Sequence, residues 1–163
     1  MRSCHFLTLA LSTFTALLLL PYATAQNSLE ETRRQVSLIP LESSDLEAAF
    51  SGKTMDGIYK IPRERTGTNK FTETFNIDGT TEYFEGPIVD GGQWIVSGAL
   101  ICFRYDGALS GGVSCFNVYR SGTCLYSYNP ANIDQDGYPY DDNRWSVKTI
   151  TRGDISTCDD LYS

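Results

Sequence analysis

Asn132, Asp134 and Asp136 have the spacing of ligands in a calcium-binding loop. Their side-chain oxygens stand at the first, third and fifth positions, and a glycine follows at the sixth, which is the order in which such a loop wraps its ion. The twelfth position holds Asn143, where a calcium loop has a bidentate glutamate. Loops rich in Asp, Asn and Gly also form ordinary solvated turns. The sequence therefore leaves both a calcium site and a plain loop open over residues 129–143.

Acidic residues on neighbouring predicted strands are a second arrangement that could do chemistry. Glu73 combines with Glu82 or Glu85, and a glycosidase uses two carboxyl groups held about 5–9 Å apart in a cleft. Acidic side chains, however, usually face solvent. The sequence also contains no Gly-x-Ser-x-Gly motif, which carries the nucleophile of many hydrolases. We therefore predict that the protein is not an enzyme and carries no cofactor.

Aromatic side chains gather in the last third of the chain. Rings beside Asp and Asn stack on sugars or anchor protein interfaces. The same rings are ordinary in strands and at the rim of a barrel, which is the interpretation that we favour. The residues concerned are Tyr126, Tyr128, Tyr138, Tyr140, Trp145 and Tyr162.

Cys102, Cys115, Cys124 and Cys158 predict two disulfides rather than a metal site. Their spacing is irregular and includes no Cys-x-x-Cys pair, whereas structural zinc sites use closely spaced pairs. An even number of cysteines in an exported chain is typical of disulfide bonding. We treat all four residues as structural.

A register argument assigns the two pairs. Placing Cys102 opposite Cys115 in a hairpin also places Ile101 opposite Phe116, so the neighbouring face is apolar, as a core face should be. Directly opposed residues of an antiparallel pair lie within disulfide reach. A two-residue turn at Ser121-Gly122 would place Tyr119, not Cys115, opposite Cys124. By elimination, Cys124 then pairs with Cys158.

Residues 1–25 predict a secretory signal peptide. Arg2 precedes an uncharged apolar run over 6–20, and a small-x-small sequence ends at Ala25. Cleavage there would remove His5, the single histidine of the chain. A histidine-based catalytic triad, metal site or pH switch is therefore excluded from the mature protein.

The charge and the hydropathy pattern restrict the partners of the exported chain. The net charge is −7, and loss of Arg2 makes it one unit more negative. An acidic protein lacks the basic surface that binds nucleic acid. After the signal peptide, no apolar stretch is long enough to span a bilayer. We therefore expect a periplasmic or secreted protein that does not span a membrane and whose partner is an unknown protein or small ligand.

Residues 26–43 form a predicted linker or arm, and residues 44–163 a single β domain. At the start of the domain, Ser44 and Glu47 fit the capping box of a short helix. Leu46 and Phe50 lie at helical spacing and would face the core, and a glycine at position 52 would end the helix.

From residue 53 onward the apolar residues alternate with polar ones. Residues 71–77 place Phe71, Glu73, Phe75 and Ile77 on one face, and an Asp-Gly turn leads to a second strand over 80–84, which predicts a hairpin. Sequential short strands favour a small antiparallel meander barrel, with a lipocalin-like barrel or a sandwich as alternatives. Further strands are predicted at 57–61, 93–96, 100–105, 113–120, 123–128 and 145–150.

Several short motifs follow one another in a recognisable order. They are Phe-Ser-Gly-Lys-Thr at 50–54, Asp-Gly-Thr at 78–80, Gly-Gln-Trp-Ile-Val at 92–96, Leu-Ile-Cys-Phe at 100–103 and Cys-Phe-Asn-Val at 115–118. Over residues 46–128 the chain resembles an exported proteobacterial family, the domain of unknown function 995. The resemblance implies a periplasmic or secreted protein of a Gram-negative bacterium and implies no activity.

These observations predict an exported, non-enzymatic protein that binds a partner or a small ligand. An inhibitor of enzymes outside the cytoplasm and a calcium-binding loop protein are the alternatives. A barrel cavity lined by aromatic residues would favour ligand binding. A rigid acidic loop over 129–143 on a filled barrel would favour an inhibitor, and a cleft with two close carboxyl groups would favour an enzyme.

Overall fold

The computed structural model describes residues 38–158 of the chain. The predicted signal peptide, the predicted arm up to residue 37 and Tyr162 lie outside these residues. Within residues 38–158, no helix is both long and apolar enough to cross a membrane.

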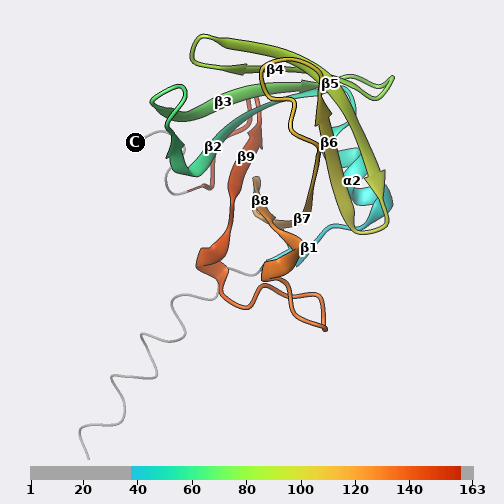
Figure 1. Cartoon of the computed structure of the whole chain (residues 1–163). Helices are drawn as coiled ribbons and strands as arrows, with labels where there is room; N and C mark the ends of the chain where they lie inside the picture. The colour runs from blue at the N-terminus through green and yellow to red at the C-terminus, as the bar shows by residue number, and fades with distance from the viewer. Residues whose placement is uncertain (1–37, 159–163) are drawn as a thin grey trace, which may run out of the picture. The chain divides into compact units, whose positions relative to one another are not determined.

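Antiparallel strands close into a barrel, shown in Figure 1. Each strand pairs with the next along the chain, and the last strand pairs with the first long one, which closes the sheet. This arrangement confirms the predicted all-β meander barrel and excludes a sandwich. The barrel strands are β2 (Lys53–Arg63), β3 (Thr68–Phe75), β4 (Thr80–Glu85), β5 (Ile88–Ser97), β6 (Leu100–Tyr105), β7 (Val113–Ser121), β8 (Cys124–Tyr128) and β9 (Val147–Thr151).

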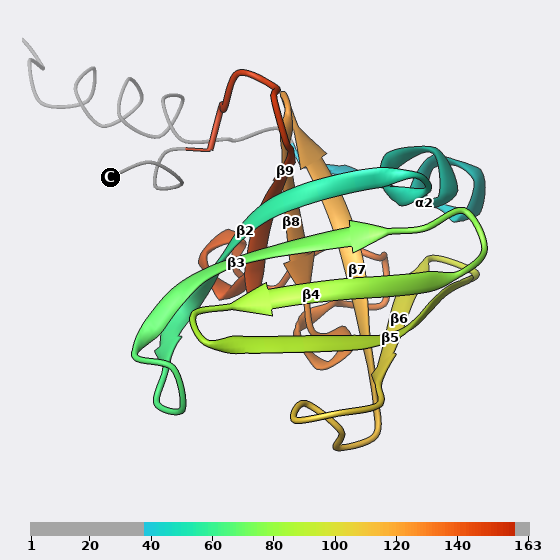
Figure 2. The ribbon, with the colours of Figure 1, turned by 90° about the horizontal axis from the view of Figure 1, so that it is seen from above.

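The short helix α2 (Ser43–Phe50) covers one end of the barrel, as Figure 2 shows. Leu46 and Phe50 are buried as predicted, and the Phe50 ring meets the edge of Phe75 at 5.0 Å between centroids. The predicted capping by Ser44 is wrong. The N-cap is Glu42, two residues before the predicted one, because the backbone carbonyl of Glu42 accepts the first helical N–H groups and the Ser43 hydroxyl donates to the carbonyl of Gly98.

Part of the predicted arm belongs to the barrel. Residues Ile39–Pro40 form the strand β1, which pairs with β7, and Leu41 is buried in the core next to the helix. The sequence does not predict this strand. The apolar run at 38–41 is too short to indicate a strand, and it follows a polar segment over 26–37.

The β3–β4 hairpin confirms the predicted turn but not every residue of its face. Phe71, Glu73 and Phe75 are buried inside the barrel, whereas Ile77 lies in the turn with 85% of its surface exposed. The strand ends at Phe75 because the Asn76 N–H already bonds the carbonyl of Thr80 across the turn.

Two apolar clusters lie on opposite sides of the sheet. The first fills the barrel beneath α2, and the second lies outside β8 and β9, beneath the loop over residues 129–146 and the C-terminal tail. Every residue of β8 is buried, because both of its faces are covered. The outer cluster consists of Ile58, Tyr119, Cys124, Tyr126, Tyr128, Ile150 and Cys158.

The structure confirms both predicted disulfides. Cys102 lies opposite Cys115 with the Cα atoms 4.1 Å apart, and Cys124 is joined to Cys158. The predicted turn before Cys124 is displaced by one residue, because β7 continues to Ser121, which pairs directly with Cys124. The displaced register still keeps Cys124 away from Cys115.

The two disulfides are expected to contribute unequally to stability. Removing Cys124–Cys158 as a double alanine variant should lower the free energy of unfolding by about 1 kcal/mol more than removing Cys102–Cys115, because it closes the longer loop (34 against 13 positions). It also fixes the tail over the outer cluster, whereas the other pair joins residues that the sheet already holds together. Urea unfolding of both variants measures the difference, and equal losses would contradict this prediction.

Candidate functional site

A pocket of about 690 Å³ opens at the end of the barrel opposite α2. The β2–β3 turn lies at that end, away from the helix, as Figure 2 shows. We call this site the mouth pocket, and its lining residues are Tyr59, Lys60, Ile61, Pro62, Arg63, Glu64, Arg65, Phe116, Trp145 and Ser146.

Three half-buried aromatic side chains form the walls of the mouth pocket. Tyr59 faces the barrel interior, where its hydroxyl lies 2.8 Å from that of Tyr83. Phe116 packs against the interior cluster from β7. Trp145 precedes β9 and packs at the edge of the outer cluster. Strand alternation places Tyr59 and Phe116 inward from opposite sides of the barrel.

Basic residues outnumber acidic ones in the mouth pocket. The Arg63 guanidinium lies 3.9 Å above the centroid of the Tyr59 ring. The Lys60 ammonium lies 5.4 Å from the centroid of the Trp145 ring and 3.5 Å from the side-chain oxygen of Asn143. Arg65 is the third basic residue, and within residues 38–158 the only acidic residue of the lining is Glu64.

Arg65 is held in place by a carboxylate below the mouth pocket. Glu85 is fully buried and accepts hydrogen bonds from Arg65 at 2.8 Å, from Thr66 at 2.5 Å and from Tyr83 at 2.7 Å. Burial acts to raise the pKa of Glu85, but these three donors outweigh it and leave the pKa below its usual value. Glu85 is therefore an anion that fixes the β2–β3 turn.

A second carboxyl group is buried deeper in the barrel. Glu73 is 4% exposed and accepts hydrogen bonds from Tyr105 at 2.7 Å and from Thr81 at 2.9 Å. Burial raises the pKa of Glu73 to about 7, and the two donors oppose this rise only in part. Glu73 is thus the group inside the barrel whose charge changes near neutral pH.

Glu73 and Glu85 are both buried in the barrel and lie outside the lining of the mouth pocket. A catalytic acid or base has to reach the substrate, yet neither carboxyl group lines the mouth pocket. Glu82, the other candidate partner of Glu73, points outward and is exposed. The buried carboxyl groups instead orient Arg65 and the tyrosines of the interior.

Comparisons with protein-family models, with curated proteins and with solved structures found no match for this chain. The resemblance to the domain of unknown function 995 therefore stays a prediction, and the geometry of the site carries the functional argument.

The predicted calcium loop uses its polar groups within the loop. One Asp134 carboxylate oxygen accepts the N–H groups of Asp136 at 3.0 Å and Tyr138 at 2.9 Å. The Asn132 amide donates to the carbonyl of Arg144. Among the residues that the structure describes, no group of three or more His, Cys, Asp or Glu side chains is placed to hold a metal ion. These bonds build a turn, and calcium binding stays an untested alternative.

The predicted aromatic group divides into three parts. Tyr126 and Tyr128 are buried, and the Tyr128 hydroxyl donates to the carbonyl of Asp142, which braces the loop. Tyr138 and Tyr140 are exposed on that loop. Among the members of this group that the structure describes, only Trp145 lines the mouth pocket, whereas the sequence favours an ordinary strand or rim position for it.

The remaining residues of the mouth pocket were missed. The sequence predicts Tyr59 and Phe116 only as strand positions. The run Lys60–Arg65 has three basic residues within six positions of an acidic chain. This local cluster is the one signal in the sequence that points to the mouth pocket.

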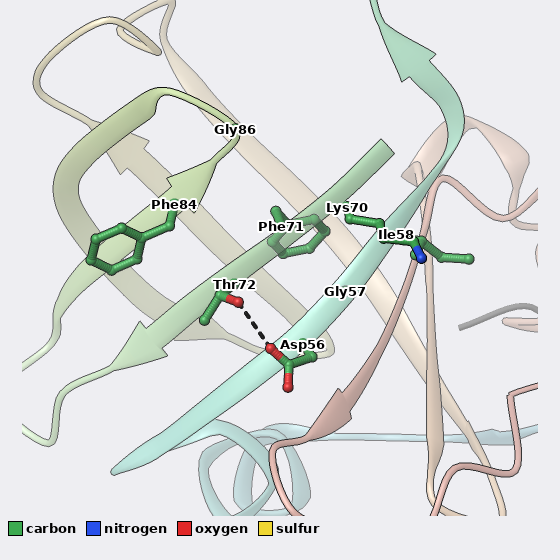
Figure 3. Close-up of a pocket in the computed structure, with 8 residues that line it drawn as sticks. All are labelled: Asp56, Gly57, Ile58, Lys70, Phe71, Thr72, Phe84 and Gly86. Carbon is green, nitrogen blue, oxygen red and sulfur yellow. Dashed lines mark hydrogen bonds between the residues drawn. The ribbon is translucent and has the colours of Figure 1, made fainter. Parts of the chain in front are cut away.

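A smaller groove of about 360 Å³ lies on the outer face of β2, β3 and β4, shown in Figure 3. Its carboxylate is already engaged, because Asp56 accepts hydrogen bonds from Thr72 at 2.9 Å and from Arg152 at 2.6 Å. The Arg152 guanidinium holds the pKa of Asp56 below its usual value. The mouth pocket is therefore the stronger candidate site.

Proposed function

We propose that this chain is an exported, non-enzymatic protein that binds a small ligand at the open end of its barrel. The observation that carries the proposal is the mouth pocket, whose walls are Tyr59, Phe116 and Trp145. Concave sites with aromatic walls and a few polar groups are the usual form of small-molecule sites, and barrel mouths are a common place for them.

The proposed export rests on separate observations. Two disulfides are typical of proteins in oxidising compartments. The predicted signal peptide over residues 1–25 and the resemblance to an exported family point in the same direction. Together they support a periplasmic or secreted location.

Binding of the neutral probe N-phenyl-1-naphthylamine tests this function. The probe fluoresces when it leaves water, and we expect saturable binding to the full-length mature protein. Trp145→Ala should weaken the affinity about tenfold, because losing one aromatic wall removes roughly 1.4 kcal/mol of binding. Phe116→Ala should act in the same direction.

The matched control is Tyr138→Ala, which removes an exposed aromatic residue that does not line the mouth pocket. We expect this variant to bind the probe like the unchanged protein. Absence of binding, or equal weakening by the control variant, would contradict the proposed function.

An enzyme inhibitor is a second candidate, favoured by one observation. The loop over residues 129–146 is braced from below by the hydroxyl of Tyr119, which donates to the carbonyl of Gly137 at 2.7 Å. Tyr138 and Tyr140 are exposed on this loop, and rigid exposed tyrosines are suited to anchoring a protein partner. The open mouth pocket makes this candidate the weaker of the two.

A further inference from the structure

We propose that the ligand of the mouth pocket is an organic anion, a carboxylate or sulfonate carried on an apolar body. This inference rests on the proposed function and adds the chemical class of the ligand to it.

The first argument is the local reversal of charge. The chain as a whole has 20 acidic and 13 basic residues, whereas the lining of the mouth pocket has three basic residues and one acidic residue. A concave site lined by one sign of charge concentrates ligands of the opposite sign. An acidic protein has no general attraction for anions, so the basic residues of the mouth pocket would have to supply it locally.

The second argument concerns which positive charges act on a ligand. Arg65 is neutralised by the buried carboxylate of Glu85. Arg63 and Lys60, by contrast, contact neutral groups, namely the ring of Tyr59 and the amide oxygen of Asn143. Their charges therefore remain to attract an anion from solution.

The third argument is the position of these charges relative to the aromatic walls. Arg63 and Lys60 are exposed at the rim, while Tyr59 and Phe116 are half-buried and face inward. A ligand that satisfies both would place its charged group at the rim and its apolar part toward Phe116. The planar guanidinium of Arg63 is the group best suited to a carboxylate or sulfonate, because it forms paired, charge-assisted hydrogen bonds.

A matched pair of fluorescent probes tests the charge preference. 1-Anilinonaphthalene-8-sulfonate and N-phenyl-1-naphthylamine share one ring skeleton and differ by the sulfonate. At low ionic strength we expect the sulfonate to bind about tenfold more tightly, as expected for one charge-assisted contact. The preference should shrink in about 0.5 M NaCl, because salt screens exposed charges.

Substitutions at the two ends of the barrel locate the effect. Arg63→Gln should weaken binding of the sulfonate more than binding of the neutral probe, and so reduce the preference from about tenfold to about twofold. Arg120→Gln makes the same change of charge near α2, far from the mouth pocket, and should leave the preference intact. Lys60→Gln serves as a second mouth variant if Arg63→Gln does not fold, as judged by far-ultraviolet circular dichroism.

The outcomes test the anion preference and the proposed ligand-binding function separately. Equal binding of both probes would overturn the anion preference and leave the proposed function standing. Failure of both probes to bind would overturn both. Equal loss of preference in Arg63→Gln and Arg120→Gln would overturn the inference as well, because the attraction would then not come from the mouth pocket.

Discussion

Replacing Glu73 with glutamine is expected to remove a pH dependence of about 3 kcal/mol from the free energy of unfolding. The folded protein holds a proton at Glu73 up to a pKa of about 7, whereas the unfolded chain loses it near the ordinary glutamate pKa of 4.5. Between these values the folded state holds more protons, so stability falls as the pH rises. A difference of about 2.5 pKa units corresponds to roughly 3 kcal/mol.

The direction of this effect distinguishes Glu73 from most carboxyl groups. Its contribution is fully present below about pH 4.5 and is lost as the pH rises through about 7. Glutamine keeps a carbonyl oxygen for the Tyr105 and Thr81 hydroxyls but has no proton to lose. The free energy of unfolding of the unchanged protein should therefore fall between about pH 4.5 and pH 8 by about 3 kcal/mol more than that of the variant.

Urea unfolding at several pH values between about 4.5 and 8 measures the difference. Glu82→Gln is the matched control, because Glu82 is on the neighbouring strand with its side chain exposed. Its curve should run parallel to that of the unchanged protein. The same slope in all three proteins would show that Glu73 does not carry the linkage.

Replacing Gly57 with valine is expected to lower the free energy of unfolding by more than about 3 kcal/mol. A Cβ atom at position 57 would lie within 3.0 Å of three ring carbons of Phe71, which Figure 3 shows beside Gly57. Tyr59 and Tyr83 restrict the movement of this ring, because they lie against it with centroids 4.8 and 5.4 Å away. Overpacking of this kind typically costs about 1–3 kcal/mol, and valine adds two further methyl groups.

Two further proteins test the cause. Gly91→Val places the same side chain where a Cβ meets only the carbonyl of Thr81 at 3.7 Å, and it should cost much less. Phe71→Ala combined with Gly57→Val should lose less stability than the two single changes added together, because the clash is gone. Strict additivity in urea unfolding would refute the steric explanation.

Features set by neighbouring residues could be predicted from the sequence. The β6–β7 register follows from the apolar face around Cys102 and Cys115, and the closure of Cys124 on Cys158 follows by elimination. The helix face of Leu46 and Phe50 follows from helical spacing. The errors at Ser44, Ile77 and the turn before Cys124 are each shifts of one or two residues, where competing hydrogen bonds decide the boundary.

The mouth pocket could not be predicted, because its walls come from distant parts of the chain. Tyr59, Phe116 and Trp145 belong to β2, β7 and the segment before β9, and only the closure of the barrel brings them together. The state of Glu73 depends likewise on Tyr105, 32 positions away. The acidic spacing of the loop over residues 129–143 is visible in the sequence, yet in the structure the Asp134 carboxylate accepts backbone N–H groups of its own turn.

The pairing of β9 with β2 also governs how this barrel folds. Asp56 and Arg152, joined across that seam, are 96 positions apart in the chain. Contacts so distant form slowly, because a long loop must close before they are made. Until β9 arrives, β2 is an unpaired edge of the kind that joins other chains into aggregates. The pairing of β9 with β2 therefore also covers an edge that would otherwise be open to self-association.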